Sequence, residues 1–89
     1  MKTIDIKALE WFDKVNGNSY FAGTVIVDYG MPTMREYKMP YQYGYGSQYE
    51  WEAAKILGID GALWRYCEDN NIILRTSKVK ALKRELKNI

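Results

Sequence analysis

The chain has 89 residues, so we expect residues 1–89 to form a single small domain. Its net charge of +2 is too small to indicate a class of binding partner. Its apolar share of 47% argues against disorder, and its aromatic share of 15% requires that core and surface both hold rings. With no histidine and one cysteine, the chain excludes serine–histidine and cysteine–histidine catalysis, a structural zinc site and an internal disulfide.

The first half of the chain predicts a β-hairpin. Residues 8–15 end at Asn16-Gly17, and this dipeptide tolerates the positive φ angles of tight hairpin turns. Residues 19–29 then supply many β-formers and predict the second strand. Gly23, in the middle of this strand, indicates a bulge or a packed ring lying over the backbone.

A further turn over residues 29–33 leads to a third predicted strand over 34–41. In this strand Arg35, Tyr37, Met39 and Tyr41 are predicted to share one face, with Glu36 and Lys38 on the other. Pro40 has no amide hydrogen to donate, so we expect it at the end of this strand or on an edge of the sheet. The three strands together predict an antiparallel meander.

A helix is predicted next. Ser47-Gln48-Tyr49-Glu50 fits the S-x-x-E capping box, in which the serine hydroxyl accepts a hydrogen bond from the third helical amide. The helix is expected to run to about Leu57, with Gly58 in the left-handed position after its end. Trp51, Ala54 and Leu57 are three residues apart and predict its buried stripe.

Two more helices are expected. Asp60 is the predicted cap of a short helix that passes through Cys67 and ends at Asn70-Asn71. Residues 72–74 form an apolar run that we interpret as a brief strand or a buried connector. Ser77 is the predicted cap of the last helix.

The last helix is predicted to be amphipathic. At 100° per residue, its apolar positions fall in one sector and its basic positions in a largely opposite one: Val79, Leu82, Leu86 and Ile89 against Lys80, Lys83, Arg84 and Lys87. From Arg75 onward there are six basic residues and one acidic residue, whereas the rest of the chain has seven and ten. Such a basic tail suits nucleic acid or an acidic protein surface, although an ordinary solvated helix face is the alternative.

The expected fold class is therefore α+β. The sequence predicts a three-stranded antiparallel meander followed by two or three short helices on one face, with a possible additional short strand at residues 72–74. No repeat or linker calls for a second domain.

Four tyrosines around two glycines form the candidate binding site. Tyr41, Tyr43 and Tyr45 alternate as on one side of an extended strand, and Tyr49 follows in the helix. Their rings suit stacking on bases or anchoring a protein interface. The alternative is that Tyr41, Tyr43 and Tyr49 pack across the sheet with their hydroxyls reaching solvent.

The sequence gives no support for catalysis. Acidic residues of the hairpin can form a carboxylate pair, but scattered solvated acids are the ordinary interpretation: Asp5, Glu10, Asp13 and Asp28. Gly44-Tyr45-Gly46 precedes a helix yet lacks the spacing of phosphate-binding loops. Cys67 is expected to be a small buried side chain. We therefore expect no enzyme activity, catalytic residue, metal or cofactor.

Two segments resemble small bacteriophage-encoded proteins of uncharacterised function. These are Trp11–Phe21, with its "NGNSY" turn, and Pro40–Gly46, with its "P-aromatic-QYGYG" loop. The resemblance covers a minor part of the chain and transfers no site residues. It implies a phage or prophage origin and expression in a bacterial cytoplasm.

The resulting expectation is a non-catalytic accessory protein that binds a host bacterial protein. Tyr41, Tyr43, Tyr45 and Tyr49 would form the contact surface, aided by the basic residues of the last helix. Single-stranded DNA or RNA, bound by the same tyrosines and basic residues, is the alternative partner. No membrane partner is expected, because the chain has no apolar run long enough for a signal peptide or a span. An edge strand in so small a sheet also allows a homodimer.

Overall fold

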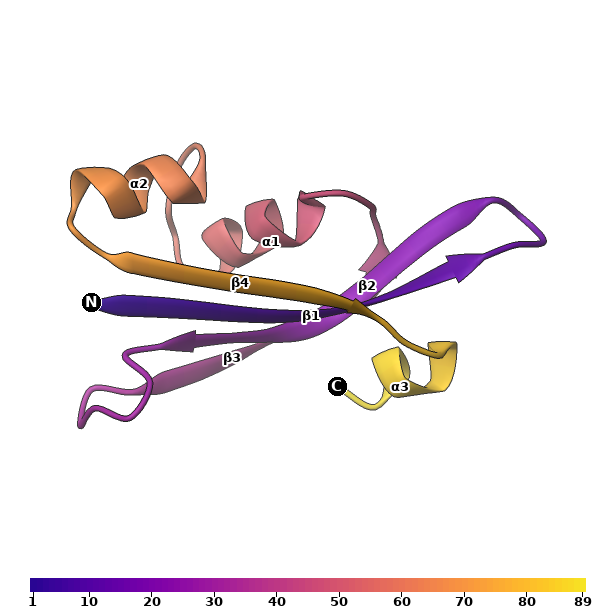
Figure 1. Cartoon of the computed structure of the whole chain (residues 1–89), viewed down its shortest axis with the longest axis horizontal. Helices are drawn as coiled ribbons and strands as arrows, with labels where there is room; N and C mark the ends of the chain where they lie inside the picture. The colour runs from indigo at the N-terminus through magenta and orange to yellow at the C-terminus, as the bar shows by residue number, and fades with distance from the viewer.

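A four-stranded mixed sheet forms the centre of the protein, whose computed structural model covers all 89 residues (Figure 1). The elements in chain order are β1 (Thr3–Asp13), β2 (Asn18–Val27), β3 (Arg35–Tyr43), α1 (Gln48–Ile56), α2 (Leu63–Asp69), β4 (Ile73–Lys80) and α3 (Lys83–Lys87). The strand order is β3-β2-β1-β4. β2 is antiparallel to both β1 and β3, whereas β4 is parallel to β1. The α+β class is thus confirmed.

The predicted meander is present as β1, β2 and β3, and the hairpin turn lies where Asn16-Gly17 predicted it. Gly17 has a φ of +71° and donates its amide to the Asp13 carbonyl at 2.8 Å. β1 begins at Thr3, five residues before the predicted start, because the alternation of Ile4, Ile6 and Ala8 on the buried face extends the strand toward the N-terminus.

A β-bulge interrupts the pairing of β2 with β3 between Phe21 and Gly23, next to the predicted position, but its extra residue lies in β3 opposite Ala22 rather than at Gly23. Pro40 belongs to β3, which is an edge strand, as predicted. Gly23 lies where the backbone of β1 comes very close: a Cβ there would be 2.9 Å from Ala8 Cα. A larger residue would not fit at this position.

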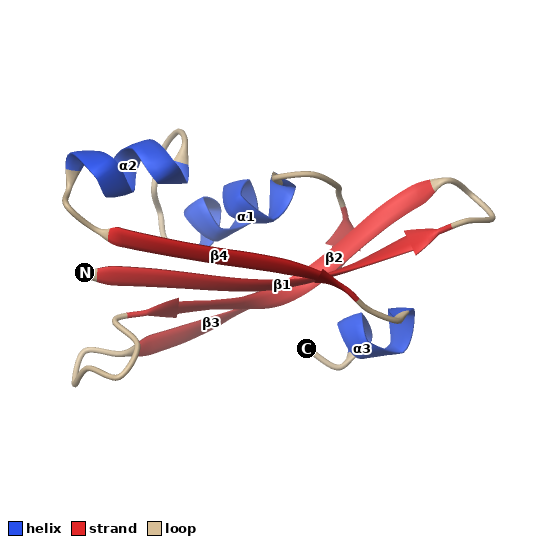
Figure 2. Cartoon of the chain, in the orientation of Figure 1, coloured by secondary structure: helices blue, strands red, loops and turns tan.

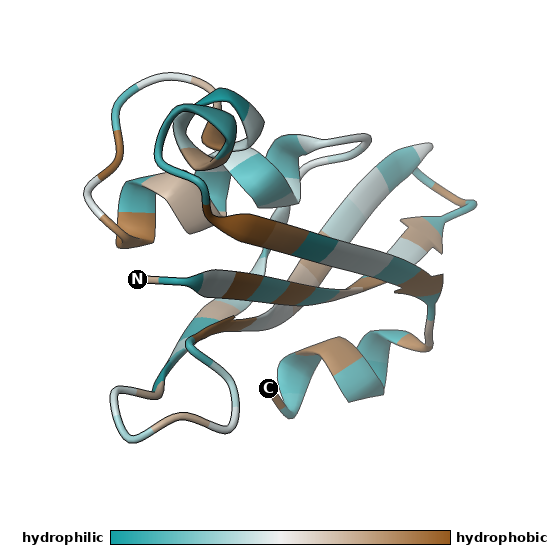
Figure 3. Ribbon diagram, turned by 60° about the vertical axis from the view of Figure 1, so that its left-hand side comes forward, coloured by the Kyte–Doolittle hydropathy of each residue, from teal (hydrophilic) through white to brown (hydrophobic).

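The two faces of the sheet are covered by different helices. α1 and α2 pack on one face, and α3 lies on the other (Figure 2). The core between the sheet and α1 and α2 contains 13 buried residues. Its strand members include Ile4, Ile6 and Met39, and its helix members include Ala53 and Leu63. Figure 3 shows the apolar stretch at the start of β4 against α2.

The predicted last helix is wrong over its first half. Residues 73–80 form the parallel strand β4, and only Lys83–Lys87 are helical. Ser77 is a strand residue paired with Lys7 and caps nothing. The physical reason is that the edge of β1 offers a full set of unpaired backbone groups, which a strand satisfies and a surface helix does not. The short strand expected at residues 72–74 is the beginning of β4.

The start of α1 after Ser47 is as predicted, but the capping interaction predicted for α1 and the cap predicted for α2 are wrong. Ser47 precedes α1 but makes no side-chain cap hydrogen bond; instead Gln48 Oε1 accepts the Tyr45 amide at 3.0 Å. The cap of α2 is Ala62, two residues after Asp60. The end of α2 at Asn70 and the left-handed Gly58 after α1, with a φ of +71°, are as predicted.

The buried stripe of α1 differs in part from the prediction. Tyr49, Ala53 and Ala54 are buried, whereas Trp51 is exposed. Tyr49 belongs to the core cluster with Ala53 and Ala54, so the buried face of α1 runs through these residues rather than through Trp51. The longest helix, α1, has nine residues, and none of the helices has the length and apolar character that a membrane span requires.

Candidate binding surface

Three stacked rings cross the sheet on the face opposite α1 and α2. The Trp11 and Tyr20 ring centroids are 5.7 Å apart with planes at 27°, and those of Tyr20 and Tyr41 are 5.1 Å apart at 10°. These rings, from β1, β2 and β3, form a ladder, and we call Trp11, Tyr20 and Tyr41 the aromatic ladder. Cross-strand aromatic pairs of this kind stabilise a sheet.

The bulge decides which tyrosines join this face. Met39 lies fully buried on the core face, so strict alternation along β3 would direct Tyr41 into the core as well. The extra residue opposite Ala22 turns Tyr41 to the other face. Tyr43, two positions on, packs the edge of its ring against Tyr20 with centroids 5.8 Å apart. Tyr41 and Tyr43 therefore share a face, as predicted, whereas the prediction that Met39 and Tyr41 share a face is wrong because of the bulge.

Two lysines of α3 lie over the rings at the two ends of the aromatic ladder. Lys83 Nζ lies 5.3 Å from the Trp11 ring centroid, and Lys87 Nζ lies 5.7 Å from that of Tyr41. Both contacts are cation–π interactions. Leu86, which lies between these two lysines in the sequence of α3, is fully buried. α3 has five residues, too few to be stable alone, so these contacts hold it in place.

The four predicted tyrosines have different environments. Tyr43 and Tyr45 are exposed to 57% and 64%, whereas Tyr49 is exposed to 9% and belongs to the core. Tyr41 is half-buried in the aromatic ladder, and burial raises the pKa of its hydroxyl above the usual value. The structure thus leaves Tyr43 and Tyr45 as the two freely accessible rings of the cluster.

The loop that carries Tyr45 is fixed from both sides. The Gly44 amide donates to the Ser19 carbonyl at 3.0 Å, and the chain passes directly over the Phe21 ring. Lys78 Nζ donates to the Gly46 carbonyl at 3.0 Å. The tyrosine is thus presented on an anchored loop.

Lys78 is a residue that the sequence did not single out. Its ammonium group also pairs with Glu10 at 3.2 Å and lies 5.9 Å from the Tyr49 ring centroid. Only the parallel pairing of β4 with β1 brings Lys78 next to Glu10, so no local pattern of the sequence indicated this role.

The four predicted basic residues do not form one helix stripe. Lys80 ends β4, whereas Lys83, Arg84 and Lys87 lie on α3. Lys80 lines a hollow of about 550 Å³ beside the β1–β2 hairpin. The other lining residues are Glu10, Trp11, Phe12, Lys14, Ser19 and Ala81. Phe12 is exposed, so the hollow presents an accessible ring beside two lysines.

The hairpin carboxylates are engaged in separate structural contacts. Asp5 pairs with Arg75 at 2.7 Å, and Glu10 pairs with Lys78. Asp13 accepts the Asn16 side-chain amide at 2.8 Å, and this hydrogen bond lowers the pKa of Asp13. No group of three or more metal-ligating side chains is present.

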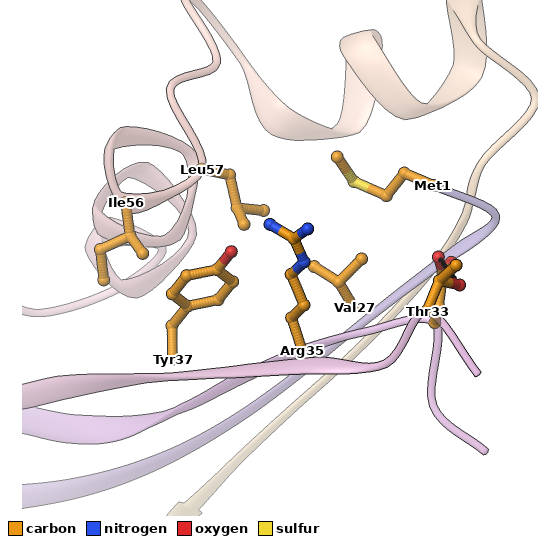
Figure 4. Close-up of a pocket in the computed structure, with 8 residues that line it drawn as sticks. Met1, Val27, Thr33, Arg35, Tyr37, Ile56 and Leu57 are labelled. Atoms are coloured by element: carbon orange, nitrogen blue, oxygen red, sulfur yellow. Dashed lines mark hydrogen bonds between the residues drawn. The ribbon is translucent and has the colours of Figure 1, made fainter. Parts of the chain in front are cut away.

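A second hollow, of about 390 Å³, lies at the other end of the sheet (Figure 4). Its lining residues are Met1, Val27, Asp28, Thr33, Arg35, Tyr37, Ile56 and Leu57. Figure 4 shows the Arg35 and Tyr37 side chains rising from β3 toward Leu57.

Asp28 in this hollow is a structural anchor. Its carboxylate accepts the Lys2 amide at 2.6 Å, the Thr3 amide at 3.2 Å and the Thr33 hydroxyl at 2.8 Å. These hydrogen bonds, with the Lys2 amide first, lower the pKa of Asp28 to about 2. The carboxylate therefore ties the start of β1 to the turn after β2.

The chain matches no protein family, no curated protein and no solved structure in comparisons with each.

Proposed function

We propose that this protein is a non-catalytic binding module that contacts an acidic surface of another protein through Tyr43 and Tyr45. The observation that carries the proposal is the position of the accessible Tyr43 ring beside two cations, with Tyr45 exposed on the loop that follows. Tyr43 packs on the aromatic ladder, whose two ends hold Lys83 and Lys87. Exposed tyrosines near cations are typical of protein interfaces, where rings anchor and charges steer.

The positions of Lys83 and Lys87 over the aromatic ladder favour a protein partner rather than a nucleic acid whose bases stack on the rings. A base that stacked on the end of the aromatic ladder would have to displace Lys83 from Trp11 or Lys87 from Tyr41. Carboxylates of a partner protein can approach the ammonium groups while Tyr43 and Tyr45 contact apolar atoms. Together with the resemblance to phage proteins, this argument supports our proposal of a host bacterial protein in the cytoplasm as the partner.

Single-stranded nucleic acid is the second candidate, and one observation favours it. The hollow beside the hairpin combines Trp11 and Phe12 with Lys14 and Lys80. Rings beside basic side chains suit a single-stranded nucleic acid, in which a base stacks on a ring and the phosphates contact the cations. In this case the affinity falls steeply with salt.

The first experiment uses the immobilised protein to capture partners from bacterial lysate. Wild type is compared with Tyr43→Ala, Tyr45→Ala and, as a matched control, Tyr29→Ala, because Tyr29 is equally exposed but lies in the turn after β2. The expected result is a captured acidic protein that is lost with the first two variants and kept with the third. Equal capture by folded Tyr43→Ala and Tyr45→Ala would overturn the proposal.

The second experiment separates the two candidates. Fluorescence anisotropy is measured with labelled single- and double-stranded oligonucleotides at low and at moderate salt. Salt-sensitive binding to single strands that weakens in Lys14→Ala and Lys80→Ala would transfer the proposal to nucleic acid. No binding at low salt would eliminate nucleic acid as the partner.

A further inference from the structure

β4 is an unprotected sheet edge. It pairs with β1 on one side only, and Figure 1 shows no other strand beside its outer edge. The opposite edge strand, β3, contains Pro40 and a bulge, and both features oppose pairing with another chain. β4 has neither a proline nor a bulge over its eight residues.

The backbone pattern shows which groups of β4 are available. Ile73 donates its amide to the Lys2 carbonyl, and Ala81 donates to the Glu10 carbonyl, at the two ends of the parallel pairing. In a parallel ladder alternate residues hydrogen-bond to the same neighbour, so the odd-numbered residues of β4 use their backbone groups toward β1. The even-numbered residues direct theirs outward: Leu74, Thr76, Lys78 and Lys80.

Of the three charged side chains of β4, only Lys80 at the end of the strand has no ion pair, so most of this edge is unguarded. Natural sheets commonly protect an edge strand with free lysines. Here Arg75 is bound to Asp5 and Lys78 is bound to Glu10, both on the neighbouring strand β1. Two apolar side chains of the strand, Ile73 and Val79, remain exposed to 60% and 55%.

We propose that β4 pairs antiparallel with β4 of a second copy of this chain, about a two-fold axis at Thr76. Outward-directed residues must oppose one another, so Thr76 faces Thr76 and Leu74 faces Lys78. This register also sets Ile73 opposite Val79 on both sides of the axis, as a pair without hydrogen bonds, in which side chains come closest. The two four-stranded sheets become one continuous sheet.

The register is self-complementary in charge as well. Acidic residues, Glu68 and Asp69, lie just before β4, and the basic residues Lys78 and Lys80 lie at its end. Antiparallel pairing places the basic end of each β4 next to the end of the partner's β4 that follows the acidic residues of α2, whereas parallel pairing would set like charges side by side. A two-fold interface of this kind closes at two copies.

Disulfide trapping tests the register. Ile73→Cys and Val79→Cys are prepared separately, mixed and oxidised mildly. The mixture is expected to give a cross-linked dimer, whereas each variant alone gives none, because only Ile73 and Val79 of different copies are opposed. Wild type serves as the control, since its one cysteine, Cys67, is buried. Cross-linking of Ile73→Cys alone to the same extent as the mixture would overturn the register.

Light scattering tests the assembly. Wild type is expected at twice the chain mass of 10.4 kDa, and Val79→Lys at the single mass. Val15→Lys is the matched control, because Val15 is exposed at the hairpin tip, and it is expected to remain dimeric. A monomeric wild type at every accessible concentration would overturn the proposal. If Val79→Lys fails to fold, the cysteine mixture still decides.

Discussion

Lys87 Nζ lies 5.7 Å from the centre of the Tyr41 ring and so connects the last helix to the third strand. The basic C-terminal region and the tyrosine cluster are therefore parts of one structure rather than two separate surfaces. Two of the four predicted basic residues, Lys83 and Lys87, hold α3 on the aromatic ladder. Lys80 and Arg84 have no such contact with a ring.

Replacing Lys87, and separately Arg84, distinguishes the contribution of α3 to stability from its contribution to binding. Lys87→Met is expected to lower the free energy of unfolding by about 0.5–1 kcal/mol, the usual size of an exposed cation–π contact. Arg84→Met, on the same helix but without a ring partner, is expected to leave stability unchanged and to weaken binding of an acidic partner. Urea unfolding and partner titration measure the two effects, and an equal loss of stability in both variants would contradict the assignment.

The acid dependence of stability is expected to depend on Asp28. Its pKa of about 2 in the folded protein lies below the ordinary value of 3.8, so the stabilisation is complete above about pH 4 and is lost as the pH falls toward 2. Asp28→Asn is expected to be less stable at neutral pH and to show a smaller decline across that window. Thermal unfolding at several pH values measures this, and parallel curves for the two proteins would contradict it.

A methyl group at Gly23 is expected to be severely destabilising. It would collide with the Lys7 carbonyl and lie 2.9 Å from Ala8 Cα, both of them backbone atoms of a central strand. Gly23→Ala is expected to cost about 3 kcal/mol or more, at the upper end for overpacking. Gly17→Ala is the control: its Cβ meets nothing within 4 Å, and its positive φ costs about 1 kcal/mol. Chemical unfolding of both variants measures the difference.

The thiol of Cys67 is expected to be unreactive in the folded protein. Burial raises its pKa, so little thiolate forms at neutral pH, and the side chain is inaccessible. A colourimetric thiol reagent is expected to label wild type slowly under native conditions and rapidly in denaturant. Rapid native labelling would show that α2 opens readily.

Local signals of the sequence located the meander well. The Asn16-Gly17 turn acts through the backbone conformation of its own residues, so it can be placed without knowing the fold. The end of α2 at Asn70 is predictable for the same reason. The need for glycine at position 23 arises only from the close approach of β1. The start of α1 was located correctly, but the capping interaction differs, because Gln48 reaches the loop in place of Ser47.

The strand β4 could not be predicted in this way. The spacing of Val79, Leu82 and Leu86 fits a helical sector, and the same residues fit a strand followed by a short helix. The choice is made by the free edge of β1, which lies far away in the sequence. The roles of Lys78 and Arg75 depend on the same pairing and were missed with it.

The candidate surface was predicted in part. The shared face of Tyr41 and Tyr43 followed from alternation, but the identity of that face depends on the bulge opposite Ala22. Trp11 and Tyr20 join these rings only after three strands are in register. Tyr49 looked equivalent to its neighbours in sequence, and its burial follows from the way α1 packs.

The parallel pairing of β1 with β4 makes the N-terminal strand dependent on a segment that is distant in the chain. Arg75 and Asp5 are 70 positions apart, and β1 remains an open edge until they meet. Closing so long a loop is slow compared with forming the hairpin. Until β4 docks, the outer edge of β1 is unpaired, and an unpaired strand edge favours pairing with another chain and so aggregation.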